Sequence, residues 1–433
     1  MRSETMPFAG AVLTVEHGKR KSLTFPVLLL LFYIIVEYGR PGFLAPLRPG
    51  LLVQGLLVLC LFSNSTKVRQ VLKEKYFRLY LLLLVFMSFQ VFVAANYFYA
   101  LICLKAMVSY LVIGLACCIF LDNLAKLNLV LVTLVLVLAT SAVSRVSGIN
   151  MLGITGGKVF ADENDFALAM NIALPFSFFL GRIKKGWKRW LLWLAGVALI
   201  LGNMVTSSRG GFVGMVAVGF ICWLYVKHRM RTIPVIAILA ILAWSFVSPY
   251  GKERIMAVGL DSAQKDTGKD RVELWKVGWK MFIHNPVTGI GQGNIPVAMN
   301  KYRFDERGES FWKQDMWGRM THSVYFTLLP ELGLIGVAIF VAMLKDLYAR
   351  KKRINWFCTK IGEDSETILN MNNALMVSVL AFLITGIFLS VLYYPPFWNL
   401  SALAVTLFMI SSRVFRQQVP PAPEEFNDRV GTC

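Results

Sequence analysis

Residues 249–323 read PYGKERIMAVGLDSAQKDTGKDRVELWKVGWKMFIHNPVTGIGQGNIPVAMNKYRFDERGESFWKQDMWGRMTHS. This polar stretch interrupts an otherwise almost continuous series of apolar segments, and its end at Thr321-His322-Ser323 stands at the entrance of the next one. In a membrane protein, a long loop that ends on an ionisable residue at a helix entrance is a common place for chemistry. We therefore expect the rest of the chain to be the scaffold for this place.

Composition sets the class of protein. Of the 433 residues, 56% are hydrophobic and only 16% are charged, and the mean hydropathy is +0.59. A soluble fold cannot bury so large an apolar share, so we expect an all-α, multi-pass membrane protein. Residues 1–21 contain no short apolar core followed by a small-residue cleavage site. The first apolar segment is therefore predicted to remain as an anchor.

Runs of about 20 mostly apolar residues predict the membrane-spanning helices. About twelve such runs are present, and the first two are short and separated by a region rich in Pro and Gly. They predict nine helices within residues 1–248, a loop domain over 249–320, three helices within 321–412 and a tail over 413–433. The predicted spans are 23–37, 50–63, 79–95, 100–121, 127–144, 166–181, 190–206, 211–226, 232–248, 322–344, 374–394 and 397–412.

The distribution of Lys and Arg predicts the orientation of these helices. With both termini in the cytoplasm, the inside segments carry 27 Lys and Arg residues and the short outside loops carry 5. This excess is what the positive-inside rule expects, and it places the long loop outside. The net charge of +20 is then mainly a topology signal, so it needs no nucleic-acid partner.

Two parts of the long loop predict local structure. Asp270 and Glu273 have the spacing of a capping box, which predicts a helix start. The run Gly289–Gly293 follows no predicted strand and is therefore not a dinucleotide loop; it is either a flexible turn or a loop whose amides approach a sugar or phosphate. The apolar face of the predicted helix, which we expect to lie on the membrane surface with its tryptophans as anchors, comprises Val272, Trp275, Trp279 and Phe282.

Three side chains on the predicted outer side have the chemistry of a transfer site. The positive helix end and Arg319 disfavour a charged His322, which makes this residue a candidate neutral base; a helix-entrance residue without function is the alternative. Arg209 stands in the tight hairpin Thr206–Gly211, where snorkelling is the alternative to anion binding. Arg271 could supply a second guanidinium. Two such forks beside a neutral histidine suit a diphosphate leaving group and a hydroxyl nucleophile.

An acidic cluster, Asp162-Glu163-Asn164-Asp165, precedes the sixth predicted span. Its spacing could hold Mg²⁺ or Mn²⁺. The alternative is that it caps the helix and pairs with nearby arginines or Lys158, and we favour this alternative. No other pattern in the sequence indicates a metal.

Five motifs follow one another in the second half of the chain, namely Ser207-Ser208-Arg209-Gly210-Gly211, Asp270-Arg271 with Trp275, His284-Asn285-Pro286-Val287-Thr288-Gly289-Ile290-Gly291-Gln292-Gly293-Asn294, Thr321-His322-Ser323-Val324-Tyr325 and Glu331-Leu332-Gly333-Leu334-Ile335-Gly336. In these motifs the chain resembles the O-antigen ligase and O-antigen polymerase superfamily. Order and spacing match over roughly residues 200–340, and the twelve-span layout extends the likeness to the whole chain. A further likeness, to a branch described as O-glycosylation ligases, lies in Glu37-Tyr38-Gly39-Arg40-Pro41 and Asn164-Asp165-Phe166-Ala167.

The resemblance implies an inverting, metal-independent glycosyltransferase of the bacterial inner membrane, with a GT-C-like fold, no cofactor and a periplasmic active site. Its donor would be a glycan on undecaprenyl diphosphate, and its acceptor a hydroxyl of lipid A-core. His322 would be the general base, and Arg209 and Arg271 would hold the diphosphate. The candidate supporting residues are Ser208, Arg319, Trp275, Arg145 and Tyr325.

A polymerase, a protein O-glycosylation ligase and a transporter are the alternatives to a lipopolysaccharide ligase. The same superfamily contains polymerases, and the O-glycosylation branch leaves a protein acceptor open. A transporter or lipid flippase is a third class, but transporters usually place ionisable residues near the bilayer midplane. Here Lys105 is nearly the only charge well inside a predicted span, which disfavours transport.

Overall fold

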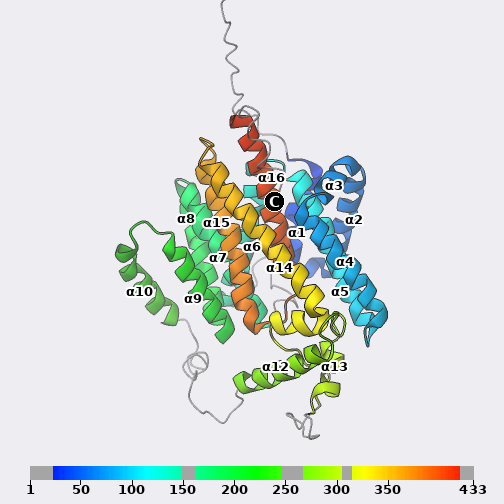
Figure 1. The fold of residues 1–433 in the computed structure, drawn as a ribbon. Coiled ribbons are helices and arrows are strands. Elements are labelled where there is room, and N and C mark those ends of the chain that lie inside the picture. The colour runs from blue at the N-terminus through cyan, green and yellow to red at the C-terminus, as the bar shows by residue number, and fades with distance from the viewer. Residues whose placement is uncertain (1–22, 149–161, 246–266, 305–314, 420–433) are drawn as a thin grey trace, which may run out of the picture.

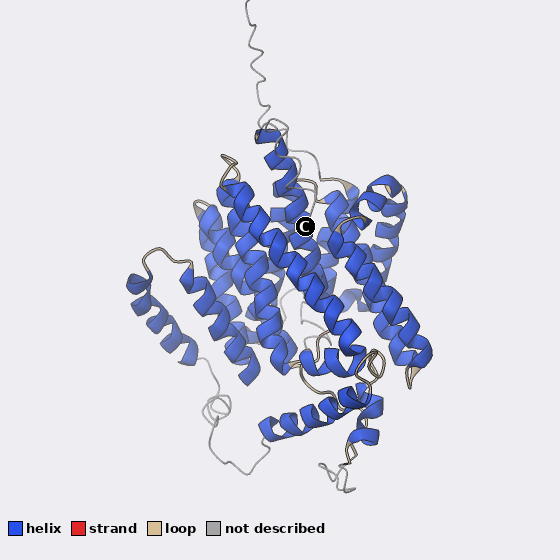
Figure 2. Cartoon of the chain, viewed as in Figure 1, coloured by secondary structure: helices blue, strands red, loops and turns tan. Residues whose placement is uncertain are grey.

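The computed structural model describes residues 23–148, 162–245, 267–304 and 315–419, which form helices joined by loops (Figure 2). Residues 1–22 and 420–433, to which the predictions for the two termini refer, lie outside this part. The elements of the first half are α1 (Phe25–Ile34), η1 (Ile35–Gly39), η2 (Gly42–Leu47), α2 (Pro49–Phe62), α3 (Ser65–Leu72), α4 (Lys75–Val93), α5 (Tyr97–Phe120), α6 (Leu124–Ser147) and α7 (Glu163–Ile183). Those of the second half are α8 (Trp187–Val205), α9 (Arg209–Leu224), α10 (Arg229–Ser245), α12 (Thr267–His284), α13 (Ile295–Tyr302), α14 (Tyr325–Cys358), α15 (Ser365–Thr385), η5 (Gly386–Phe388) and α16 (Pro395–Gln418).

Each predicted span contains a helix, but not all of these helices are long enough to cross a membrane. In the described ranges, eight helices are long and apolar enough, namely α4, α5, α6, α7, α8, α14, α15 with η5, and α16. A ninth is reached if α2 and α3, which are bent by 96°, count as one span. The other predicted spans, α1, α9 and α10, have fewer than 18 residues. The all-helical membrane class is thus confirmed, while the number twelve and the GT-C-like fold stay predictions.

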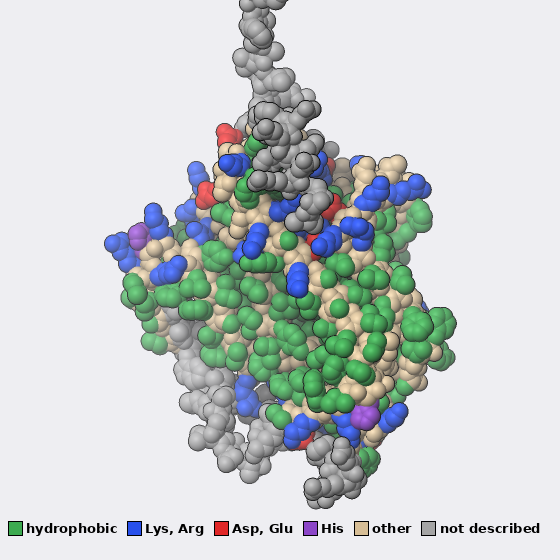
Figure 3. Space-filling view, in the orientation of Figure 1, with side chains coloured by type: hydrophobic (Ala, Val, Ile, Leu, Met, Phe, Trp, Pro, Cys, Tyr) green, Lys and Arg blue, Asp and Glu red, His purple; other side chains and the backbone are tan. Residues whose placement is uncertain are grey.

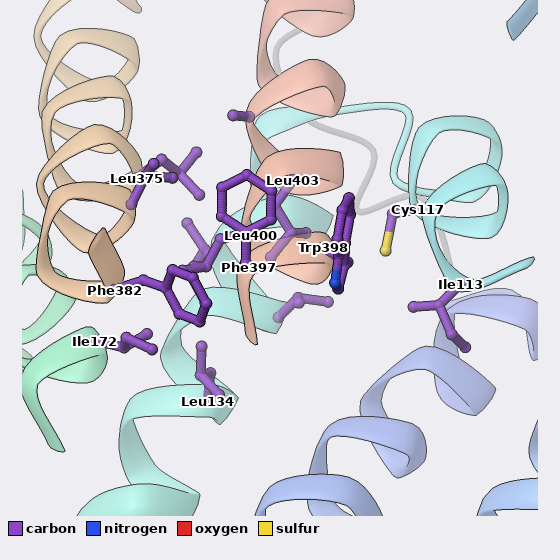
Figure 4. Packing of buried hydrophobic residues seen from close by; sticks show 14 of the residues in the cluster. Ile113, Cys117, Leu134, Ile172, Leu375, Phe382, Phe397, Trp398, Leu400 and Leu403 are labelled. Atoms are coloured by element: carbon purple, nitrogen blue, oxygen red, sulfur yellow. The ribbon is translucent and has the colours of Figure 1, made fainter. Parts of the chain in front are cut away.

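Helix α7 is the centre of the bundle. It packs against α8 and α15, and 83% of its most apolar stretch of 18 residues is buried inside the protein. The core beside it is aromatic: Phe397 lies 5.3 Å from Phe382 and 5.0 Å from Trp398 between ring centroids (Figure 4). α7 and α16 therefore form an interior around which the more exposed spans, such as α4, are arranged.

The surface has the distribution expected of a membrane protein. Figure 3 shows a hydrophobic band across the middle of the molecule, with Lys and Arg side chains gathered toward its two ends. Helices α12 and α13 lie beyond one end of the bundle, and the end of α16 lies at the other (Figure 1). Helices α12 and α13, which belong to the long loop, and the C-terminal end of α16 are thus on opposite sides. Which side is periplasmic remains a prediction from charge.

Helix α12 differs from its prediction in two ways. It begins at Thr267, so Asp270 lies in its first turn and is not its cap, and Glu273 forms an ion pair with Lys276 (2.8 Å). The buried face of α12 consists of Leu274, Val277 and Met281. On the predicted apolar face, Val272 and Trp279 are 47% and 48% exposed. The capping-box prediction is therefore wrong, and two members of the predicted face are available to a membrane surface.

A break in α14 joins the outer helices to the bundle. Gly333 has φ +58°, and this break frees the carbonyl groups of Pro330 and Glu331, which accept hydrogen bonds from the amides of Ile290 (2.8 Å) and Gly291 (3.1 Å). In return, Leu334 N and Ile335 N donate to Pro286 O and Val287 O. Glu331 is fully buried, and its Oε1 accepts from Ile295 N (3.1 Å) at the start of α13. These bonds form a seam between α14 and the loop.

The seam overturns both interpretations of the glycine-rich run. Its amides at Ile290 and Gly291 are already bonded within the protein, so they do not present themselves to a sugar or phosphate. The run is not a freely flexible turn either, because Gln90 Nε2 donates to Thr288 O and Glu331 O and thereby ties it to α4. Its glycines allow close packing: a Cβ at Gly289 would lie 2.5 Å from Glu331 O.

Candidate active site

Arg209 is the first residue of α9, and the turn before it is tightly held. Ser207 has φ +54°, a left-handed conformation that is uncommon for a residue with a Cβ. Ser208 caps α9 by accepting a hydrogen bond from Gly211 N (3.0 Å), and its hydroxyl donates to Asn164 Oδ1 (2.6 Å) at the start of α7. Ser208 therefore fixes where α9, and with it Arg209, begins.

A buried polar network lies behind this turn. Asn171 Nδ2 donates to Gly211 O (2.9 Å) and to Thr385 Oγ1 (3.1 Å), while Asn171 Oδ1 accepts from Asn203 Nδ2 (2.8 Å). Asn171 and Asn203 are 1% and 2% exposed. Hydrogen bonds in such a dry environment are strong and specify one arrangement. The Arg209 turn is therefore supported by α7, α8 and α15, which sequence patterns did not predict.

Arg271 is carried by α12, and Trp275 attaches this helix to the segment that bears His322. The indole Nε1 donates to Thr321 O (2.9 Å), and the ring stacks on Phe326 with centroids 5.2 Å apart and planes 7° apart. Trp275 is thus a bridge from α12 to the start of α14, rather than the simple membrane anchor of the sequence prediction. The guanidinium carbon of Arg271 lies 5.8 Å from the ring centroid of Phe388.

The turn η5 brings the three candidate side chains into one neighbourhood. A Cβ at Gly210 would lie 2.8 Å from Phe388 Cβ, so the residue after Arg209 packs on Phe388. Gly386 O accepts a hydrogen bond from Val324 N (2.8 Å), two residues after His322. Arg271 lies over the same Phe388 ring. Sequence analysis missed Phe388, because an uncharged aromatic residue at the end of a span carries no signal of its own.

His322 has the environment of a neutral base. It is half-buried and has φ +49°, a conformation that a non-glycine residue adopts only when its surroundings impose it. Burial lowers the pKa of its imidazole, the charges of Arg271 and Arg319 lower that pKa further, and Asp162 opposes them. The sequence predicts the same lowering of the His322 pKa. The main cause is burial, and Arg271 has a larger effect than Arg319.

Two further candidate residues, Arg145 and Tyr325, make contacts that hold them near the site. The guanidinium carbon of Arg145 lies 4.8 Å from the ring centroid of Phe166, at the start of α7. The Tyr325 hydroxyl donates to Leu383 O (3.0 Å) on α15. Arg145 therefore borders the acidic cluster, while Tyr325 ties α14 to the helix that leads into η5.

The acidic cluster caps α7, as the favoured interpretation of the sequence held. Asp162 is the N-cap residue, and its Oδ1 accepts from Asn164 N (2.6 Å). Lys158 lies outside the described residues. Within the ranges that the structure describes, no group of three or more His, Cys, Asp or Glu side chains is arranged to hold a metal ion.

Comparison with protein families identifies the region that contains these residues. Residues 191–341 match the model of the family described as O-antigen ligase. Over these residues the chain carries an O-antigen ligase domain. The match includes Arg209, Arg271 and His322, and it supports the superfamily of O-antigen ligases and polymerases. No curated protein matches the sequence.

Proposed function

We propose that this O-antigen ligase domain transfers a glycan from undecaprenyl diphosphate to a hydroxyl of lipid A-core, on the periplasmic face of the inner membrane and with inversion. The acceptor oxygen attacks the anomeric carbon while His322 takes the hydroxyl proton. The bond from that carbon to the diphosphate oxygen breaks, and the diphosphate leaves with the electron pair. Arg209 and Arg271 hold the diphosphate and stabilise its developing charge.

The observation that carries this proposal is the lowered pKa of His322 beside Arg271. A general base must be neutral before the reaction, and a lowered pKa keeps the imidazole unprotonated at a lower pH. A guanidinium that repels a proton from the histidine also attracts an anion to the same place. One arrangement thus prepares both the base and the leaving-group site.

The two arginines suit a diphosphate because of their geometry and their different supports. A planar guanidinium forms bidentate bonds with phosphate oxygens, and a hydrogen bond to a charged group contributes about 1.5 to 3 kcal/mol. Arg209 is the first residue of α9 in the bundle, and Arg271 lies on α12 outside it. Gly210, the residue after Arg209, packs on Phe388, and the Arg271 guanidinium lies over the same ring. A diphosphate between them would be bound from two sides, and no metal ion is needed to offset its charge.

Transfer by the purified protein tests the proposal. The full-length chain in lipid nanodiscs is given a glycan on undecaprenyl diphosphate and lipid A-core, and the product is detected by mass spectrometry, with the anomeric configuration determined by NMR. Transfer with inversion is expected, and His322→Ala should reduce it by a factor of about 100 to 10,000. Retention of configuration, or near-normal transfer by His322→Ala at matched expression, would contradict it.

A further inference from the structure

A narrow pocket with a few polar groups lies next to the proposed site and brings together two motifs that the mechanism leaves unused. Its walls include Glu37 and Tyr38 from η1, Asp165 from the first turn of α7, and Tyr394 immediately before α16. Both motifs that resemble the O-glycosylation branch, around Glu37 and around Asp165, therefore meet in one place. Apolar walls are supplied by Leu168, Ala169, Pro395 and Pro396.

The polar groups of this pocket form a set that can bind a hydroxyl. Burial together with the charge of Asp165 raises the pKa of Tyr394 to about 12, so its phenol remains a donor. Arg40 Nη2 lies 3.2 Å from Glu37 Oε1 and orients that carboxylate. A carboxyl group has two oxygens that accept hydrogen bonds, so each acid retains capacity for a ligand.

The pocket adjoins the candidate catalytic centre. Asp165 follows Asn164, whose Oδ1 accepts from Ser208, the residue before Arg209. Asp162 acts electrostatically on both His322 and Tyr394. Asp162 thus acts on both the pocket and His322, and Arg271 and Arg319 also act on His322.

We propose that this pocket is a subsite for a hydroxyl group of an uncharged sugar ring. This inference rests on the proposed function. Carboxyl groups and a phenol accept hydrogen bonds from hydroxyls and donate hydrogen bonds to them, whereas the guanidiniums around His322 attract a diphosphate, so the diphosphate is assigned to the arginines and the sugar hydroxyl to the pocket. The narrowness of the pocket fits one hydroxyl, with Tyr38 in its wall. The hydroxyl belongs either to the acceptor ring or to the first sugar of the donor.

Substrate titrations with the full-length protein in nanodiscs test this subsite. The variants are Glu37→Gln, Asp165→Asn and Tyr394→Phe, and the matched control is Glu163→Gln, an exposed acid in the same helical turn that does not line the pocket. The probes are lipid A-core and a disaccharide on undecaprenyl diphosphate. We expect a rise of about tenfold in KM for one of the two substrates in each pocket variant, and no change in the control.

The substrate that responds identifies the source of the hydroxyl. A rise in KM for lipid A-core assigns it to the acceptor, and a rise in KM for the donor assigns it to the donor sugar. Unchanged KM values for both substrates, or an equal effect of Glu163→Gln, would overturn the subsite. If one variant fails to fold, the other two still decide the result, because each removes a different polar group.

A second measurement separates this inference from the proposed function. An acceptor that carries a phosphate on the reacting ring should be a poorer substrate than the unphosphorylated ring, and Glu37→Gln should reduce that preference because it removes one repelling charge. If His322→Ala abolishes transfer while Glu37→Gln and Asp165→Asn leave both KM values and the preference unchanged, only the subsite is wrong. If His322→Ala transfers normally, the proposed function is wrong.

Discussion

Arg209 and Arg271 stand in two regions that are held in opposite ways. The turn before Arg209 belongs to the bundle and rests on Asn171 and Asn203, which are almost completely buried. Arg271 belongs to a helix outside the bundle. That helix is connected to the bundle by the seam at Gly333, by the bond from Trp275 to Thr321 O and by contact with Phe388.

This difference divides the site into a fixed half, which carries Arg209 in the bundle, and an attached half, which carries Arg271 on α12. Interior packing has few alternatives, so the position of Arg209 should change only when the bundle itself is destabilised. The position of Arg271 depends on a limited set of contacts across the seam. Changes to the seam should therefore affect function more than stability, and changes to the buried network should affect both.

The largest effect is expected from Gly333→Ala. A Cβ there would lie 2.5 Å from Val287 O and 2.6 Å from Gly289 N, and its φ of +58° disfavours alanine. Displacement of α12 by about 1 Å should lower transfer by about 100-fold. The melting temperature of the bundle should change little. The control is Gly219→Ala, where an added Cβ meets nothing within 4 Å; equal activity of the two variants would show that the seam does not position Arg271.

A smaller loss of function is expected from Asn171→Leu, which changes the buried network behind Arg209. It removes the bond that Asn171 donates to Gly211 O and the bond that it accepts from Asn203, and it should destabilise the protein by about 1 to 3 kcal/mol. Donor affinity, measured well below the melting temperature, should fall by roughly tenfold. Asn370→Leu is the control, because the Asn370 side chain donates to Glu366 O within its own helix. Lowered stability with unchanged donor affinity would mean that the network does not position Arg209.

Removal of either of two charges around His322 should shift the pH profile of transfer, in opposite directions for the two charges. Transfer should rise with pH as the imidazole loses its proton, in a range below pH 6.5 because its pKa is lowered. Arg319→Gln removes a charge that lowers this pKa, so the acid limb should move to higher pH. Asp162→Asn removes a charge that raises it, so the limb should move to lower pH, and Asn still caps α7.

The profile is measured as initial rate at saturating substrates between pH 4.5 and pH 8, roughly the range in which histidine titrates. Arg353→Gln, at an exposed position of α14 remote from the break, is the control and should leave the limb in place. Shifts of the two variants in the same direction would exclude His322 as the group that titrates.

The smallest effect is expected from chelation. If the two guanidiniums offset the charge of the diphosphate, EDTA should leave the transfer rate unchanged in protein prepared without added divalent ions. Activity that disappears with EDTA and returns with Mg²⁺ or Mn²⁺ would contradict this account. It would also make Asp162 and Asp165 candidate ligands.

The sequence predicted the spans and the charged residues better than their supports. Apolar runs were sufficient to place the helices, though not to say which of them are long enough to cross a membrane, and motif spacing singled out Arg209, Arg271 and His322 as candidates. The break at Gly333 and the role of Phe388 could not be predicted, because both depend on which segments meet in space. The same limit explains Trp275, whose helical spacing indicated a membrane-facing side while its indole bonds Thr321. It also explains the glycine run, whose amides are used by α14.

Donor binding by three variants tests the central claim most directly, namely that the arginines act on the donor and the histidine on the acceptor. Affinity for the undecaprenyl-diphosphate glycan is measured on purified full-length protein in nanodiscs. Arg209→Ala and Arg271→Ala should each weaken it by about 10- to 100-fold, with only partial rescue by Lys. His322→Ala should bind the donor normally and lose transfer by about 100- to 10,000-fold. Equal loss of donor affinity in all three variants, or normal affinity in both arginine variants, would contradict the account.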